Sequence, residues 1–399
     1  MKEWKECTIA DLGEVVGGAT PSTRKPENYE NGDIAWITPK DLSTFNGRFI
    51  FRGERNITEI GLKSCSTRLL PPNTVLFSSR APIGYVAIAA KEMCTNQGFK
   101  SVIPNADTDY MFLYYLLKYN RDSIENMGSG TTFKEVSGNT MNSIKVRVPV
   151  DKEEQRRIGA ILSAIDDRIE QNTAINENLL QQAVAIFDNA LEQSKHISHA
   201  ELGSFADVKG GKRLPKGVNL ITTPNLHPYI RVRDLNDVVF ASLSANYEYV
   251  DDETQKTISR YITSTGDVLI SIVGTIGLTA IVDKSLDKAN LTENCVKVTN
   301  LRGISPEYLI LFLRSQNGVK EIQKGTVGAV QAKLPIKNIQ SINIPLLPQS
   351  EMQSLNNTLT TLFSQISTNT AESKCLASIR DSLLPQLMNG EIDVSEVQI

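Results

Sequence analysis

The 399-residue sequence has few cysteines, few histidines and no long apolar run. Its five cysteines are odd in number, far apart and without a CxxC pair, which argues against a disulfide framework and a zinc knuckle; they are Cys7, Cys65, Cys94, Cys295 and Cys375. We therefore expect reduced thiols. No stretch reaches the roughly 18 apolar residues of a membrane-spanning helix, and the first residues lack the apolar core of a secretion signal. These absences predict a cytoplasmic protein.

Sequence motifs of the common catalytic sites are also missing. Residues 128–132 have the glycines of a phosphate-binding loop without its lysine, and no GxSxG, HExxH or Gly-rich dinucleotide fingerprint occurs. His196 and His199 form a close pair without a neighbouring cysteine, which favours a solvated helix end over a metal site, and His227 stands apart. We expect no catalytic residues, no metal and no cofactor.

Charge and composition are those of a globular protein with several parts. Hydrophobic residues make up 40% and charged residues 22%, and the length suggests two or three domains. The net charge of -3 hides a segregation, because residues 1–150 and 201–348 carry +2 and +3 whereas 151–200 and 349–399 each carry -4. The long stretches are thus where an anionic partner would bind, although imbalances of this size also arise by chance.

The sequence repeats at almost half its length. Residues 75–84 match residues 268–277 at five positions in ten, at an offset of 193. Further on, an offset of 197 aligns Lys100 with Lys297, and near the start Leu12 resembles Leu202. Each copy begins with short apolar runs between Gly, Pro and Asn, which read as strands with one helix among them. We expect two similar α+β globules, residues 1–150 and 198–348.

Long helices are predicted after each globule, in residues 151–197 and 349–399. From Ile158 and from Leu355, apolar residues recur at steps of four and three, and one seam asparagine recurs at 197 residues, as Asn172 and Asn369. A 42-residue helix from position 151 to 192 would be roughly 60 Å long at about 1.5 Å per residue. The simplest arrangement of the two helices is an antiparallel coiled coil whose register the two asparagines fix. The whole chain would then be a pseudo-two-fold internal repeat. The alternative is two separate amphipathic helices, each on its own globule.

The C-terminal end of this second helix has two residues that affect helix geometry. Pro385 should kink or fray the last turns, and Gly390 is placed to cap the end.

Two similar globules held apart by rigid helices suit a partner with two spaced features. DNA with two separated half-sites is such a partner, and the mildly basic globules agree, because Lys and Arg neutralise phosphates.

Several segments resemble the DNA specificity (S) subunits of type I restriction-modification systems. The order globule, helix, globule, helix is similar, and so are the following segments: residues 12–22, 34–37 and 41–42, the passage from 143–149 into 153–158, and the ending 383–394. The resemblance covers essentially the whole chain.

The resemblance implies a chain that reads DNA and does no chemistry. In that family, each target recognition domain reads one half of a bipartite site, and the paired helices fix the unread spacer. The helices also dock two modification subunits, which carry S-adenosylmethionine and methylate adenine, and restriction subunits join to form the nuclease. The acidic, Asn- and Gln-rich outer faces of the helices would then bind protein, although such faces are also ordinary solvated surfaces.

Candidate readers of DNA are polar side chains expected on loops, because Arg or Lys matches guanine and Asn or Gln matches adenine in the major groove. In the first globule they are Arg24, Lys25, Lys40, Arg80, Gln97, Lys100 and Thr132. In the second they are Lys212, Arg213, Arg231, Arg233, Asn294, Lys297, Gln331 and Lys333. The aligned Lys100 and Lys297 are alternatively phosphate contacts common to both halves, and any single member is alternatively a surface side chain without a contact.

Two other classes of function remain open. One is an assembly scaffold whose globules bind proteins, which would show no salt-dependent affinity for DNA. The other is an enzyme with an unfamiliar site, which would require turnover by the isolated chain.

Overall fold

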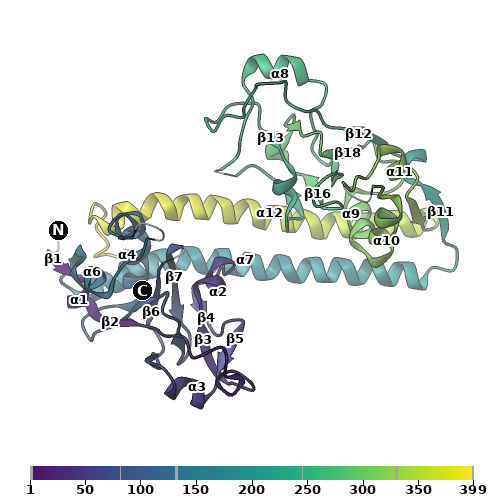
Figure 1. The fold of residues 1–399 in the computed structure, drawn as a ribbon. Helices are drawn as coiled ribbons and strands as arrows, with labels where there is room; N and C mark the ends of the chain where they lie inside the picture. The colour runs from purple at the N-terminus through teal and green to yellow at the C-terminus, as the bar shows by residue number, and fades with distance from the viewer. Residues whose placement is uncertain (1–2, 81, 131–133, 245, 329–330, 398–399) are drawn as a thin grey trace. The chain divides into compact units, whose positions relative to one another are not determined.

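The computed structural model describes residues 3–80, 82–130, 134–244, 246–328 and 331–397, and it divides into two compact units. Unit 1 comprises Met1–Gln171 and Glu372–Ile399, and unit 2 comprises Asn172–Ala371. Both boundaries fall inside long helices, so each unit consists of one globule with a part of each helix (Figure 1).

The first globule is built on a mixed five-stranded sheet. Its strand order is β2 (Gly13–Gly17), β9 (Lys100–Pro104), β6 (Val75–Ser79), β7 (Ile83–Ala89) and β4 (Phe49–Ile50). Neighbours run antiparallel except for the parallel β7–β4 pair. Every residue of the central β6 is buried, as expected for a strand covered on both faces. Two smaller sheets complete the globule: β5 (Arg55–Ile57), β3 (Ile34–Ile37) and β8 (Cys94–Thr95), and the pair β1 (Trp4–Thr8) and β10 (Lys145–Pro149).

One apolar helix fills the core of this globule. Helix α4 (Tyr110–Tyr119) begins at Asp109, whose carboxylate accepts a hydrogen bond from Phe112 N (2.9 Å), and six consecutive residues from Phe112 are buried. The remaining helices are short: α1 (Ile9–Leu12), η1 (Pro26–Asn28), α2 (Pro39–Ser43), α3 (Glu59–Lys63), α5 (Arg121–Asn126) and α6 (Gly138–Ser143).

The second globule repeats this plan. Its five-stranded sheet has the order β12 (Asp207–Gly210), β18 (Cys295–Thr299), β15 (Val268–Ser271), β16 (Thr279–Val282) and β14 (Phe240–Ala241). The small pairs are β13 (Tyr229–Ile230) with β17 (Asn290–Leu291) and β11 (Ser198–Glu201) with β19 (Asn343–Leu346). The pairing directions within the five-stranded sheets also agree, so the predicted internal repeat of α+β globules is confirmed.

The helices of the second globule follow the same order. They are η2 (Leu202–Ser204), η3 (Val232–Leu235), α8 (Asp252–Ile258), η4 (Lys284–Leu286), α9 (Pro306–Arg314), α10 (Gln316–Gly325) and α11 (Ile336–Gln340).

Strand register corrects two details of the repeat. Val75 pairs with Val102 and Val268 pairs with Val298, so the offset of 193 in β6 becomes 196 in β9. Lys297 therefore corresponds to Ser101, and the alignment of Lys100 with Lys297 was wrong by one residue. A slip of one residue moves a side chain to the other face of a sheet. The two lysines thus occupy different environments.

The predicted correspondence of Leu12 with Leu202 at the start of each copy is also wrong. Ile9 N donates to Ile144 O (3.0 Å), and Leu202 N donates in the same way to Ile342 O (2.9 Å). Leu202 therefore corresponds to Ile9 rather than to Leu12, because the offset of 193 already holds at this point.

Two long helices, α7 (Lys152–Gln193) and α12 (Gln349–Met388), run antiparallel where they meet (Figure 1). In unit 2, Asn172 Nδ2 donates to Asn369 O (3.4 Å), and Asn369 Nδ2 donates to Asn176 Oδ1 (2.9 Å). Because Asn176 Nδ2 also donates to Ile366 O (3.4 Å), the numbering rises along one helix as it falls along the other. The seam asparagines thus lie in contact, and their role in fixing register stays a prediction.

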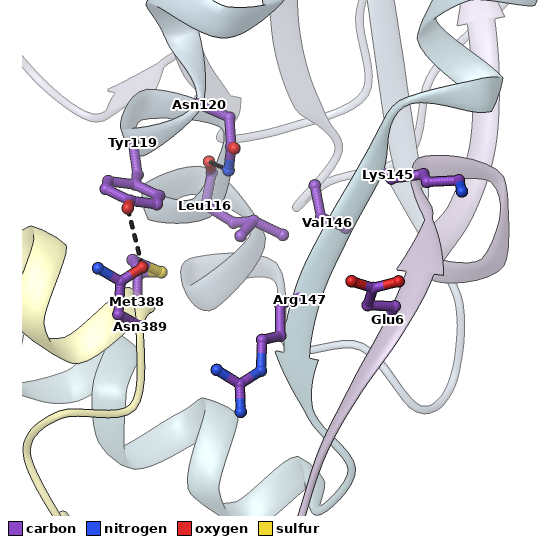
Figure 2. A pocket seen from close by; sticks show the side chains of 9 residues that line it. All are labelled: Glu6, Leu116, Tyr119, Asn120, Lys145, Val146, Arg147, Met388 and Asn389. Atoms are coloured by element: carbon purple, nitrogen blue, oxygen red, sulfur yellow. Dashed lines mark hydrogen bonds between the residues drawn. The ribbon is translucent and has the colours of Figure 1, made fainter.

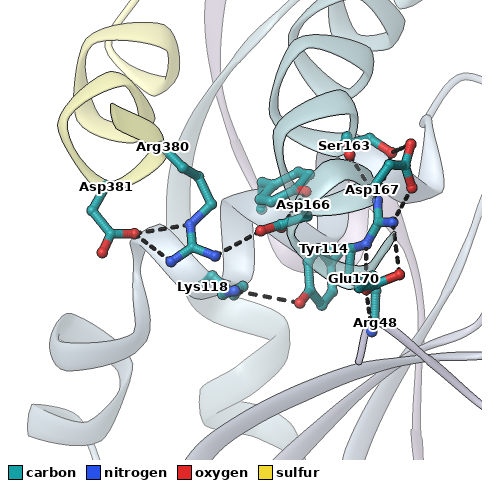
Figure 3. A network of polar contacts seen from close by, with 10 residues as sticks. Arg48, Tyr114, Lys118, Ser163, Asp166, Asp167, Glu170, Arg380 and Asp381 are labelled. Atoms are coloured by element: carbon teal, nitrogen blue, oxygen red, sulfur yellow. Dashed lines mark hydrogen bonds and ion pairs between the residues drawn. The ribbon is translucent and has the colours of Figure 1, made fainter. Parts of the chain in front are cut away.

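The part of the helix pair in unit 1 contains a buried ion pair (Figure 3). Arg380 Nη1 lies 2.6 Å from Asp166 Oδ1, and the hydroxyl of Tyr115 donates to Asp166 Oδ2 (2.6 Å). Burial and the neighbouring Asp166 carboxylate raise the pKa of Tyr115, whereas burial lowers the pKa of Lys118. The sequence predicts an apolar contact between the two helices, and the structure places a polar group of side chains there, around Asp166 and Arg380.

The C-terminal segment packs on the first globule (Figure 2). Helix α12 continues through Pro385 to Met388, and Gly390 adopts a φ of 72° and donates from its N to Leu387 O (3.2 Å), as expected for a C-terminal cap. The Tyr119 hydroxyl donates to Asn389 Oδ1 (2.9 Å). A pocket of about 240 Å³ remains there, lined by Glu6, Leu116, Lys145, Val146 and Arg147 together with Tyr119, Asn120, Met388 and Asn389.

All five cysteines have free thiols. Burial raises the pKa of Cys94 to about 11 and that of Cys295 to about 12, so these two are unreactive at neutral pH. Within the described ranges, no helix is long and apolar enough to cross a membrane.

Candidate nucleic-acid interface

The first globule brings predicted residues together where β6 and β9 meet Glu135 and Val136. Arg80 follows β6 directly and forms a β-bridge with Glu135. Arg80 Nη1 lies 3.9 Å and Lys100 Nζ lies 3.4 Å from the carboxylate of Glu135. One carboxylate is therefore shared by two cations and holds both at the end of β6 and the start of β9, where a net positive charge remains.

Gln97 lies beside this group, in the turn between β8 and β9. Ser79 N donates to Gly98 O (2.7 Å), which joins this turn to the end of β6. The Thr20 hydroxyl donates to the side-chain carbonyl of Gln97, and Gln97 is exposed. An exposed amide close to a guanidinium offers the groups that read adenine and guanine edges. The predicted Thr132 lies outside the described residues.

The other candidates of the first globule are exposed surface cations. Arg24 and Lys25 precede η1, and Lys40 lies on α2 with its Nζ 2.7 Å from Glu54 Oε2. The hydrogen bond to Glu54 raises the pKa of Lys40. All three are placed to meet an anion without being part of the group around Glu135.

The second globule has the same backbone arrangement at the corresponding edge. Val273 forms a β-bridge with Lys333, as Arg80 does with Glu135. Ile272 N donates to Asn294 O (2.8 Å), which matches the bond from Ser79 N to Gly98 O. Three predicted residues, Asn294, Gln331 and Lys333, therefore lie on this edge or next to it, and Gln331 and Lys333 are exposed.

Equivalent backbone positions thus carry different side chains in the two globules. The bridged pair is Arg80 with Glu135 in the first and Val273 with Lys333 in the second. A fixed backbone that carries different side chains at equivalent positions is an arrangement suited to recognising two different sequences.

Two candidates of the second globule lie in the segment after β12. Arg213 Nε lies 2.7 Å from Glu293 Oε1, and Lys212 Nζ lies 5.5 Å from the centre of the Tyr261 ring. Both side chains are exposed, so a phosphate could replace these partners.

Arg231 and Arg233 share one acid. Both guanidinium groups pair with Glu248, at 2.7 Å in the case of Arg233, and Arg233 Nε also lies 3.5 Å from Asp234. The structure therefore groups these two arginines at η3, with Arg231 at its N-terminal cap and half-buried and Arg233 within it and exposed.

Lys297 has its polar partners inside its own globule. Its Nζ lies 3.1 Å from the carboxylate of Asp267 and donates to Ile262 O (2.8 Å), and its side chain is 13% exposed against 4% for Asp267. To bind a phosphate, a largely buried lysine of this kind would have to give up its carboxylate partner. The alignment behind the prediction that Lys100 and Lys297 make equivalent contacts does not hold, because the strand register places them one position apart and they pair with different acids.

Sequence reasoning missed the acids that hold the candidate cations. Glu135, Glu248 and Glu293 are each 15 or more positions from a partner, so no local pattern reveals them. For Glu135 a signal existed, since an offset of 198 aligns it with the predicted Lys333. Within the described ranges, no cluster of three or more His, Cys, Asp or Glu is suited to hold a metal ion.

Comparison with known proteins identifies the family. The model of the type I restriction modification DNA specificity domain matches residues 1–181 and again 197–376. The specificity subunit of the type I restriction enzyme MjaIX from Methanocaldococcus jannaschii is 32% identical over 425 residues, covering 99% of this chain and 95% of the relative. The HindI specificity subunit from Haemophilus influenzae is 22% identical, covering 98% of this chain and 100% of the relative.

A solved structure shares the fold. The type I restriction-modification S subunit from M. genitalium superposes with a TM-score of 0.61 at 18% identity, covering 97% of this chain and 96% of the other. Two copies of the family domain and a relative above 30% identity along nearly the whole length lead to one conclusion. The chain belongs to the type I restriction-modification DNA specificity family, whose members are non-catalytic subunits of restriction-modification complexes.

Proposed function

We propose that each globule reads one half of a bipartite, asymmetric DNA site, with residues 1–150 and 198–348 as the two target recognition domains. The observation that carries this proposal is the pair of matched bridges, Arg80 with Glu135 and Val273 with Lys333. The backbone is the same and the side chains differ, which is what two readers of different half-sequences require.

Within each globule, the candidates divide by chemistry. Arg80, Gln97, Asn294 and Gln331 offer the guanidinium and amide groups that pair with base edges. The exposed cations Arg24, Lys25, Lys40, Lys212, Arg213, Arg233 and Lys333 suit phosphates, which fix position and supply salt-dependent affinity. Lys100 and Arg231 orient their neighbours through shared acids.

The helix pair has two further roles in this proposal. Helices α7 and α12 set the unread spacer, with Asn172 and Asn369 fixing their register. Their exposed faces, which are acidic and rich in Asn and Gln, dock two modification subunits that methylate adenine, and restriction subunits complete the nuclease. The chain itself contributes recognition, and the chemistry resides in its partners.

A substitution of Arg80 tests the reading role directly. Arg80→Ala should relax one position of the first half-site at a cost of about 1–3 kcal/mol, because a base contact is lost, and should leave the second half-site unchanged. The measurement is the affinity of the chain in complex with its modification subunits for a set of single-base variants of the site, at several salt concentrations.

Arg68 provides the matched control. It is an exposed arginine of the same globule, paired with Glu14, and Arg68→Ala should leave the preferred sequence unaltered. An Arg80→Ala complex with the wild-type sequence preference would refute the reading role of Arg80, and affinity that ignores both salt and sequence would favour a protein scaffold.

A further inference from the structure

At one corresponding place, the two globules contact their long helices through different chemistry. In unit 1 the fastening centres on Arg48, in the turn that leads into β4. Its side chain is 4% exposed and points into a group of acceptors on α7 (Figure 3). Nε donates to Glu170 Oε1 (3.0 Å), and Nη1 donates to Ser163 Oγ (2.6 Å). Nη2 donates to Glu170 Oε2 (3.2 Å) and also pairs with Asp167.

The backbone of Arg48 extends this connection into the sheet. Arg48 N donates to Glu170 Oε1 (3.2 Å), and Ile88 N in β7 donates to Arg48 O (2.7 Å). Ser163, Asp167 and Glu170 are spaced by four and three residues, so they share one face of α7 over two turns. The edge of the five-stranded sheet is thereby fixed to that helix face at several points.

Unit 2 has an apolar contact at the corresponding place. Phe49 pairs with Ile88 and Phe240 pairs with Ile281, so Val239 is the counterpart of Arg48, and Ile281 N donates to Val239 O (2.9 Å) as Ile88 N does to Arg48 O. Val239 packs against the core, and the Phe240 ring meets the Phe363 ring of α12 edge to face, with centroids 6.2 Å apart.

The polar contact in unit 1 and the apolar contact in unit 2 differ in how narrowly each restricts the orientation of its globule on the long helix. A guanidinium presents its donors in a rigid planar fork, so a carboxylate held by two of them has few allowed orientations. Apolar contacts are not directional and tolerate small rotations. The orientation of the first globule on α7 is therefore set by Arg48 more narrowly than shape alone would set it.

We propose that Arg48 is a positioning residue that fixes the angle of the first globule on its helix and thereby the distance at which the first half-site is read. The inference rests on the proposed function. A change of one base pair in a spacer moves a half-site by about 3.4 Å along the duplex axis and by about a tenth of a turn around it. A globule fixed through Arg48 rejects such a displaced half-site, and one that lacks the Arg48 contacts accepts it.

The test is methylation mapping with the full chain and its modification subunits in a methylation-free host. For Arg48→Ala, we expect methylation at sites with a spacer one base pair longer or shorter to rise about tenfold over the wild-type background, since small misplacements have effects of this order or larger. Both half-sequences should persist. Arg48→Lys keeps the charge without the fork and should lie in between, and Arg52→Ala, at an exposed neighbour, should match the wild type.

If Arg48→Ala does not accumulate, Glu170→Gln removes the charge of the paired carboxylate while keeping its shape, and the same spacer change is expected on a smaller scale. A folded, active Arg48 variant with a single unaltered spacer would overturn the inference, and so would equal loss of methylation at every site. Absence of a bipartite motif with the wild-type chain would instead count against the proposed function, so the two failures are distinguishable.

Discussion

Replacing Arg380 with alanine should destabilise unit 1 by about 3 kcal/mol, because removing one partner leaves the other charge buried. The Asp166 side chain is only 7% exposed, and its ionic partner, Arg380, lies 2.6 Å away. In the variant, the Asp166 carboxylate keeps the hydrogen bond from the Tyr115 hydroxyl, which carries no charge. Hydrogen exchange of the α4 segment and of residues 372–388, together with urea unfolding, measures the loss.

Arg168 is the matched control for this prediction. It pairs with Glu372 across the same two helices at 3.0 Å, but the two side chains are 48% and 37% exposed. Arg168→Ala should leave the stability of unit 1 almost unchanged, since solvent screens such a pair.

A compensating variant separates the cost of leaving a charge buried without its partner from the cost of disturbed packing. Asp166→Leu with Arg380→Met and Tyr115→Phe removes the buried carboxylate together with the two groups that donate to it, and buried ion pairs replaced in this way often lose little stability. We expect most of the loss to be recovered. An Arg380→Ala effect no larger than that of Arg168→Ala would contradict the importance assigned to this pair.

Exchanging globules should have the largest effect on recognition. A chain whose residues 9–144 are replaced by residues 202–342 should direct methylation to a site with two copies of the second half-sequence. The ends of the two segments correspond, because Ile9 N bonds to Ile144 O as Leu202 N bonds to Ile342 O. The replacement therefore preserves the connection to β1 and β10.

The helix surface has to change with the globule. At an offset of 197, Asp166 corresponds to Phe363 and Arg380 to Ala183, and Phe363 and Ala183 lie in one apolar core cluster. The exchange is therefore combined with Asp166→Phe and Arg380→Ala. The same two substitutions without the exchange form the control and should keep the original first half-sequence. A combined variant that still methylates the original first half-sequence would refute the assignment of that half to the first globule.

The duplication and the long helices were accessible from the sequence because each rests on a local pattern. The match of residues 75–84 with 268–277 predicted two globules of one plan, and the apolar seam predicted helices that the structure places at Lys152–Gln193 and Gln349–Met388. Gly390 at the end of α12 was likewise readable as a cap, because its place after an apolar helix requires a residue that tolerates positive φ.

The environment of each charged side chain was not accessible in this way. Lys297 looked like a free cation, and only the strand register shows that it faces Asp267. Arg48 was not among the candidates, because its acceptors on α7 follow more than 100 positions later and no spacing rule connects them. Pairing between distant segments depends on tertiary structure, so a single sequence predicts the types of groups present better than their partners.

We expect this one chain to recognise two separate half-sequences at a fixed distance. The most direct measurement is to express the wild-type chain with its cognate modification subunit in a methylation-free host and to map modified adenines across the genome. A single bipartite motif, with one spacer length and two different halves, is the predicted result. Methylation without such a motif, or no methylation by a complex whose modification subunit is bound and active, would contradict it.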